Sequence, residues 1–263
     1  MNLRWLLALL PAAALLAGGC GGDDGGGESS ANPSASKPAL TISAAASLKA
    51  AFTAYGKQFE EATARFSFAG SDELAAQIKQ GVKPDVFAAA NTGLPDQLYE
   101  QGLVEKPAVF AGNRLVLAVP ADGSEVRSLD DAGDDGVTIA VGSESVPIGS
   151  YTRTVLEKLP ARQSEQILDN VRSEEPDVAG IVGKLTQGAV DAGFVYVSDV
   201  RGAGGRLEAI ELPDDVQPSV AYGVAVVKDA ENPEQAQAFI DGLLSGAGQQ
   251  ALEAAGFEPP PQR

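Results

Sequence analysis

The stretch Arg65–Asn91, RFSFAGSDELAAQIKQGVKPDVFAAAN, reads as a strand, a tight turn, a helix, a loop and a second strand. With Ala64, its start alternates apolar and polar residues, which is the period of a half-buried strand. Ser71 follows Gly70 at the place of a helix N-cap, and the next residues carry one apolar stripe that ends at Gly81. The final run, VFAAA, is typical of a strand buried on both faces. The stretch therefore predicts a β–α–β unit of an α/β sheet.

Ser71 would lie at the carboxyl end of one strand and the amino end of the next helix. Free N–H groups and the helix dipole favour a bound anion at such a junction. Upstream, Leu40–Ser47 (LTISAAAS) reads as a short strand before an amphipathic helix, so Ser47 occupies a second junction of this kind. Helix capping explains either serine alone. Two such serines in consecutive units, both among small residues, favour a ligand site.

The rest of the chain continues to alternate strands with helices. We expect strands at Asn113–Pro120, Val137–Val141, Gly193–Val197 and Val220–Val227, and a strand or its approach at Gln166–Arg172. We expect helices at Leu94–Gln101, Tyr151–Leu159, from Pro176 onward, at Pro233–Leu244 and near Gln249–Ala255. This order predicts an α/β architecture with mostly parallel sheets. The apolar runs 115–119 and 220–227 are candidates for crossover strands between two lobes.

Composition excludes several kinds of function. The 263 residues include 36 acidic and 19 basic side chains, a net charge of -17 that argues against nucleic acid as a partner. There is one cysteine and no histidine. The common cysteine and histidine metal sites therefore cannot form, nor can a Ser–His or Cys–His nucleophile pair.

The N-terminus has the pattern of an export signal. Met1–Arg4 carries positive charge, and Trp5–Leu16 is an apolar run too short to span a bilayer. The single cysteine, Cys20, follows Ala17-Gly18-Gly19 and resembles the lipobox cysteine of bacterial lipoproteins, although a leucine is usual in place of Ala17. The resemblance implies that Cys20 is acylated and becomes the new N-terminus. A cleaved signal peptide with an incidental cysteine is the alternative.

These features divide the N-terminal region into two parts. Residues 1–19 are expected to be a signal peptide. After the cysteine, residues 20–38 contain no Val, Ile, Leu, Met or aromatic residue, and they are expected to be a flexible, lipid-anchored tether.

Seven motifs occur in an order and spacing that resemble one family. They are AAASL (Ala44–Leu48), FAGSDELAAQI (Phe68–Ile78), KPDVFAAAN (Lys83–Asn91), GNRLVLAVP (Gly112–Pro120), VGSESVPIGSY (Val141–Tyr151), PDVAG (Pro176–Gly180) and GFVYVSDV (Gly193–Val200). Together they resemble the molybdate-binding proteins of bacterial ABC transporters. The resemblance implies two Rossmann-like lobes joined by two crossover strands, the type II periplasmic binding protein fold. Lobe one would comprise 39–117 plus 223–263, and lobe two 118–222.

The resemblance also implies the ligand-binding residues. Ser47 and Ser71 would donate to an oxyanion through hydroxyl and backbone groups, Ile148 and Val178 through backbone N–H groups, and Tyr196 through its phenol. The serines belong to lobe one and the other three to lobe two, so the anion would lie between the lobes and close them by a hinge motion. Helix N-termini would supply oriented N–H dipoles without a counter-charge.

The function implied is binding of molybdate or tungstate and its delivery to a membrane ABC permease. The protein would be a monomer without enzymatic activity or cofactor, exported and anchored to the outer face of the cell membrane by a lipid on Cys20.

Two alternatives remain open from the sequence. Asp72 follows Ser71, where small polar residues are common in the family, and a carboxylate there would repel a dianion. We expect Asp72 to point outward at the start of its helix; otherwise the site takes phosphate or sulfate, or a hard cation held with Glu144. A serine hydrolase using Ser47 and Lys49 is the second alternative, but Lys49, two residues along a helix, points elsewhere.

Overall fold

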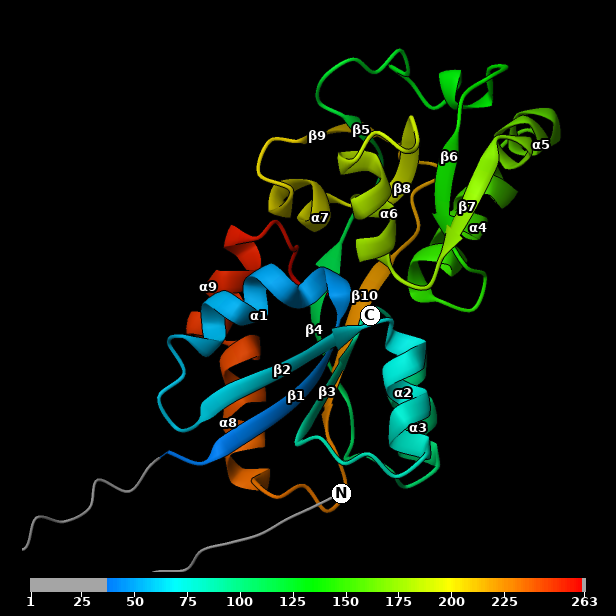
Figure 1. The fold of residues 1–263 in the computed structure, drawn as a ribbon. Coiled ribbons are helices and arrows are strands. Elements are labelled where there is room, and N and C mark those ends of the chain that lie inside the picture. Colours follow the sequence, from blue (N-terminus) through cyan, green and yellow to red (C-terminus); the bar gives the residue numbers. More distant parts are fainter. Residues whose placement is uncertain (1–36, 262–263) are drawn as a thin grey trace, which may run out of the picture. The chain divides into compact units, whose positions relative to one another are not determined.

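The computed structural model describes residues 37–261, which form two five-stranded sheets with helices on their faces (Figure 1). The first sheet has the order β2-β1-β3-β10-β4. Its strands are β1 (Ala39–Ala45), β2 (Thr63–Ala69), β3 (Val86–Ala89), β4 (Ala108–Asn113) and β10 (Val220–Val226). β1 runs parallel to β2 and β3, whereas β10 runs antiparallel to β3 and β4.

The second sheet has the order β7-β6-β8-β5-β9. Its strands are β5 (Leu115–Pro120), β6 (Ile139–Gly142), β7 (Val171–Glu175), β8 (Ala192–Tyr196) and β9 (Leu207–Glu211). β6 is parallel to β7 and β8, and β5 is antiparallel to β8 and β9. Both sheets are therefore mixed rather than mostly parallel. In the first sheet β10 makes the antiparallel pairs, and in the second sheet β5 makes them. Each of these two strands directly follows a crossing of the chain between the sheets.

Helices cover both faces of the first sheet (Figure 1). One face carries α1 (Lys49–Gly56), α8 (Pro233–Leu244) and α9 (Ala247–Ala254), and the other carries α2 (Ser71–Lys79) and α3 (Gly93–Glu100). On the first face the rings of Phe52 and Phe239 meet edge to face at 5.6 Å. On the second, Leu74 and Leu98 pack with Phe87 of β3 in a separate apolar cluster. The sheet is thus buried on both sides, as its continuous apolar strands require.

The second sheet is flanked by α4 (Pro147–Lys158), α6 (Val178–Thr186) and α7 (Val197–Gly202), with α5 (Ala161–Asp169) packed on α4. Short 3₁₀ turns occupy Ala46–Leu48 and Asp131–Gly133. The first of these turns leads directly into α1 and carries Ser47, so it decides where that serine lies.

The chain passes between the sheets twice. Arg114 separates β4 of the first sheet from β5 of the second, and residues 212–219 lead back from β9 to β10. β5 pairs only within the second sheet and β10 only within the first. The sequence-based lobe limits, after 117 and after 222, fall inside these two strands; as domain limits they stay a prediction.

Several elements differ from the sequence-based expectation. The strand expected over Gln166–Arg172 is wrong in its first part, because α5 extends to Asp169 and β7 begins at Val171. Ile167 is the only buried residue of α5, so its apolar face was too narrow to be recognised. The run expected as one strand from Asn113 is divided, since Asn113 ends β4 and β5 begins at Leu115.

The predicted signal peptide, Cys20 and most of the tether lie outside the described residues. Within 37–261, no helix is long and apolar enough to cross a membrane.

Candidate functional site

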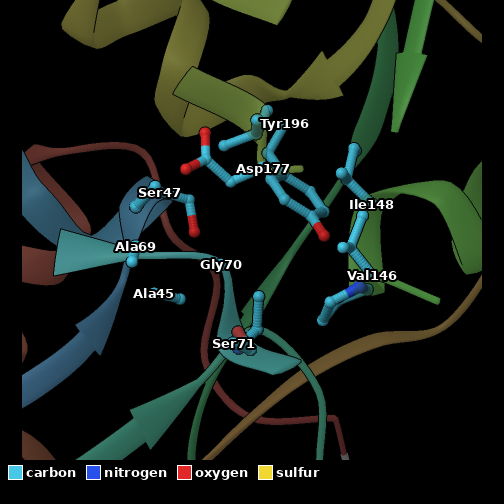
Figure 2. A pocket seen from close by; sticks show the side chains of 13 residues that line it. Ala45, Ser47, Ala69, Gly70, Ser71, Val146, Ile148, Asp177 and Tyr196 are labelled. Carbon is cyan, nitrogen blue, oxygen red and sulfur yellow. The ribbon is translucent and has the colours of Figure 1, made fainter. Parts of the chain in front are cut away.

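One pocket lies where segments of both sheets approach each other. It contains about 240 Å³ of empty space, part of it open to solvent. Residues from the ends of β1, β2, β3 and β8 and from the N-termini of α2, α4 and α6 line it. All five residues predicted from the sequence are among them: Ser47, Ser71, Ile148, Val178 and Tyr196. Figure 2 labels Ser47, Ser71, Ile148 and Tyr196. The structure therefore brings the predicted residues together; that they bind a ligand stays a prediction.

Three helices begin at this pocket. Ser71 is the first residue of α2, Ile148 the second of α4 and Val178 the first of α6. The first N–H groups of an α-helix have no partner within their own helix, so three sets of backbone donors start here. Their dipoles add positive potential at the same place. The pocket is suited to an anion without any cationic side chain.

The expectation that Ser71 is an N-cap is wrong, because Gly70 occupies the N-cap position. Gly70 has the extended backbone of an N-cap (φ -59°, ψ 139°), whereas the hydroxyl oxygen of Ser71 accepts a hydrogen bond from the N–H of Ala90 at 3.0 Å. Ser47 likewise lies inside a 3₁₀ turn, and its oxygen is 3.0 Å from the hydroxyl oxygen of Tyr222. Since Ser71 already accepts, its own hydroxyl hydrogen remains available to a group in the pocket.

Tyr196 supplies the most informative side chain. It ends β8 and is 1 % exposed, yet its hydroxyl has no hydrogen-bond partner among the described residues. Figure 2 shows its ring among the other lining side chains. Burial raises the pKa of Tyr196 well above its ordinary value, so the phenol stays protonated and can donate. A buried hydroxyl without a partner is costly, which indicates that a ligand completes it.

Sequence reasoning did not assign Asp177 to the pocket, although its carboxylate side chain lines it. Asp177 caps α6: its Oδ1 accepts the N–H of Gly180 at 3.0 Å. A negative charge at a helix N-terminus is favourable, which offsets part of its repulsion toward an anion. The sequence shows the Pro-Asp start of this helix. It does not show that Asp177 lies near Ser47 and Ser71, because that depends on how segments of the two sheets meet.

The two carboxylates of the cation alternative are not together in the pocket. Glu144 is exposed, and neither Asp72 nor Glu144 lines the space between the five residues. Asp72 was expected to point outward; instead it is half-buried at the second position of α2, and its Oδ1 is buried without a hydrogen-bond partner among the described residues. In the same described part, no group of three or more Cys, Asp or Glu side chains is arranged to hold a metal ion.

Beside Asp72, the N-terminus of α2 comes very close to the loop before α6. A Cβ atom placed on Gly70 would lie 2.7 Å from the carbonyl oxygen of Pro176 and 2.9 Å from Oδ1 of Asp72. Only glycine allows this approach of the α2 N-terminus to the loop before α6.

Asp199, three residues after Tyr196, is a carboxylic acid with a raised pKa near the site. Its Oδ2 accepts the backbone N–H of Tyr196 at 3.0 Å. Burial raises the pKa of Asp199 to about 7, the bond from Tyr196 opposes the rise, and the charge of Asp177 adds to it. The folded protein therefore holds a proton on Asp199 between roughly pH 4 and 7, where an unfolded aspartate with a pKa of about 3.9 has lost it.

We predict that thermal stability falls as the pH rises from about 4 to 7, since in this window the folded state holds a proton on Asp199 that the unfolded state has lost. An Asp199→Asn variant keeps an acceptor for the Tyr196 N–H but cannot titrate. Its melting temperature should therefore depend much less on pH, and each 1 kcal/mol of this difference corresponds to about 2–4 °C. The chain contains no histidine, which would titrate in the same range. Melting curves of both proteins test this, with the exposed Glu208→Gln as control. An unchanged slope in the Asp199 variant would contradict it.

Known proteins resemble most of the described region. Residues 40–258 match the family model described as bacterial extracellular solute-binding protein. The molybdate-binding protein ModA of Mycobacterium tuberculosis is 34% identical over 238 residues, covering 88% of this chain and 89% of the relative.

Two solved structures show the same fold. The periplasmic molybdate-binding protein of Azotobacter vinelandii has a TM-score of 0.76 at 19% identity, covering 84% of this chain and 100% of that one. The sulfate-binding protein SubI of M. tuberculosis has a TM-score of 0.70 at 17% identity, covering 84% and 87%. These matches confirm the two-lobe type II α/β fold and the family resemblance recognised in the motifs. The chain belongs to the bacterial extracellular solute-binding proteins.

Proposed function

We propose that this protein binds molybdate or tungstate in the pocket between its two lobes and delivers the oxyanion to an ABC permease. The relative with 34% identity, named a molybdate-binding protein, supports the choice of ligand. The observation that carries the proposal is the buried hydroxyl of Tyr196, which has no partner among the described residues and lines the same pocket as the four other predicted donors.

The chemistry of the donors agrees with a tetrahedral dianion. Ser47, Ser71 and Tyr196 would contribute hydroxyl groups, and Ile148 and Val178 backbone N–H groups at helix starts. All are neutral donors, so selectivity would come from the size of the cavity rather than from net attraction. The smaller sulfate would leave some hydrogen bonds unmade, at roughly 1–3 kcal/mol each.

The protein would carry its ligand without transforming it. Ser47, the candidate nucleophile of the hydrolase alternative, has its oxygen against the hydroxyl of Tyr222 rather than against a base. We further propose that the lobes of the sequence-based division, 39–117 plus 223–263 and 118–222, close on the ligand by a hinge motion about the crossings. Acylation of Cys20 would hold the monomeric protein at the outer face of the membrane.

The alternatives are less well supported. The sulfate-binding structure is 17% identical, so it supports the fold alone and not a sulfate or phosphate site. A cation site would need Asp72 and Glu144 to converge, but Glu144 is exposed and neither residue lines the pocket.

The proposal predicts a selective gain of thermal stability with molybdate and tungstate. The experiment uses the chain from Lys37, which contains both sheets as a separate compact unit. A ligand at about a thousand times its dissociation constant adds roughly 4 kcal/mol to the free energy of unfolding. Molybdate and tungstate should raise the melting temperature strongly, with little effect from sulfate, phosphate or calcium. A shift with phosphate or calcium alone would contradict the proposal.

A further inference from the structure

A chain of buried hydrogen bonds connects the second sheet to Ser47 through the crossing region. Asn113, the last residue of β4, donates through Nδ2 to the hydroxyl oxygen of Ser198 in α7 at 2.9 Å and, at a longer 3.5 Å, to that of Tyr222 in β10. The hydroxyl of Tyr222 is in turn 3.0 Å from that of Ser47. These four side chains, Asn113, Ser198, Tyr222 and Ser47, are between 0% and 6% exposed.

The direction of this chain follows from the amide of Asn113. Its Oδ1 accepts the backbone N–H of Arg114 at 2.9 Å, and an N–H can only donate. The amide is therefore oriented with its Nδ2 toward Ser198 and Tyr222, and both amide hydrogens point at hydroxyl oxygens.

The orientation determines which hydroxyl donates at Ser47. Tyr222 is fully buried, and burial raises the pKa of Tyr222 well above its ordinary value, so it keeps its hydrogen. Of its two hydrogen-bond neighbours among residues 37–261, the Nδ2 of Asn113 cannot accept, whereas the oxygen of Ser47 can. The hydrogen of Tyr222 thus goes to Ser47, and the hydrogen of Ser47 is left for the pocket. Ser71 is arranged in the same way by the N–H of Ala90.

We propose that Tyr222 and Asn113 are positioning residues that hold the hydroxyl of Ser47 as a donor toward the bound oxyanion. This inference rests on the proposed function. A serine hydroxyl rotates freely and can donate or accept, whereas a fully deprotonated oxyanion offers only acceptors. Fixing the donor direction before binding removes an ordering cost, and the chain of hydroxyl groups polarises the final bond.

The test is a double-mutant cycle measured by titration calorimetry with whichever of molybdate and tungstate binds the wild-type chain more tightly. Tyr222→Phe keeps the ring that packs edge to face on Phe257 and removes only the hydroxyl. It should weaken binding about 5- to 20-fold, and Ser47→Ala at least as much. In the Ser47→Ala background, Tyr222→Phe should change the affinity by less than about twofold, since it acts through Ser47.

A matched control is Tyr55→Phe, which removes another buried hydroxyl, bonded to the carbonyl oxygen of Phe239 and outside the pocket. Its affinity should equal that of the wild type. If Tyr222 had a purely structural role, Tyr222→Phe would instead weaken binding equally in the wild-type and the Ser47→Ala background. That result would overturn the inference.

A second variant reverses the direction of the chain. Asn113→Asp keeps an acceptor for the N–H of Arg114 but offers Tyr222 an acceptor where the amide offered a donor. The hydrogen of Tyr222 should then turn away from Ser47, and the affinity should fall further than in Tyr222→Phe, at an unchanged fold checked by circular dichroism. If Tyr222→Phe and Asn113→Asp both bound the oxyanion as tightly as the wild type, the inference would be overturned and the proposed function would stand. A wild-type chain that binds no oxyanion would overturn the proposed function, and the inference with it.

Discussion

Replacing Ser71 with alanine should weaken molybdate binding by about 100-fold. The hydroxyl of Ser71 has two tasks in the structure: its oxygen accepts the N–H of Ala90 at 3.0 Å, and its hydrogen is free for the pocket. A hydrogen bond to a charged group contributes roughly 1.5–3 kcal/mol, and the substitution also leaves the N–H of Ala90 without its acceptor. Titration calorimetry measures the affinity, and melting curves report how far the fold is affected.

Ser43 provides the matched control for this substitution. It is a buried serine on β1, 6% exposed, and does not line the pocket. Ser43→Ala should leave the affinity within about twofold of the wild type. If Ser71→Ala bound molybdate as tightly as Ser43→Ala does, the hydroxyl of Ser71 would not be a ligand donor.

Gly149→Ala is expected to damage both the fold and the site. Gly149 is the third residue of α4, and an added Cβ would lie 1.9 Å from the carbonyl oxygen of Ser143 and 2.5 Å from that of Gly142. Both neighbours are backbone atoms, so the first turn of α4 must move as a whole, and with it the N–H of Ile148. Overpacking of this kind costs about 1–3 kcal/mol or more. We expect a lower melting temperature and at least tenfold weaker binding.

A second helical glycine serves as the control. Gly183 lies in α6, and a Cβ there would meet only the side-chain Nε2 of Gln187, at 3.9 Å. Gly183→Ala should be neutral or stabilising, because alanine favours the helix by up to about 1 kcal/mol. Equal melting temperatures for the Gly149 and Gly183 variants would show that the α4 turn is not tightly packed.

The parts of the fold that follow from local patterns were predictable. The strand at Thr63–Ala69, the helix at Ser71–Lys79 and the strand at Val86–Ala89 agree with the alternating run, the apolar stripe and the continuous apolar run from which they were predicted. α5 and β9 were missed because little of either is buried: Ile167 is the only buried residue of α5, and three of the five residues of β9 are exposed.

The residues of the site also differ in whether a local sequence pattern predicts them. Ser47 and Ser71 were found because each follows a strand and precedes a helix, which is a local signal. Ile148, Val178 and Tyr196 came only with the family's motifs. Asp177 and Tyr222 were not assigned to the site at all, because their places depend on contacts between distant segments; Tyr222 is 175 residues from Ser47 along the chain. Sequence patterns show which positions are strand ends, but not which ends meet.

The binding site itself is tested most directly by a crystal structure of the chain from Lys37 grown with tungstate, using the anomalous scattering of tungsten. We expect a single strong peak in the pocket, with tungstate oxygens within hydrogen-bond distance of the hydroxyl groups of Ser47, Ser71 and Tyr196 and of the N–H groups of Ile148 and Val178. Tungsten bound elsewhere, or an empty pocket in a protein that binds tungstate in solution, would contradict it.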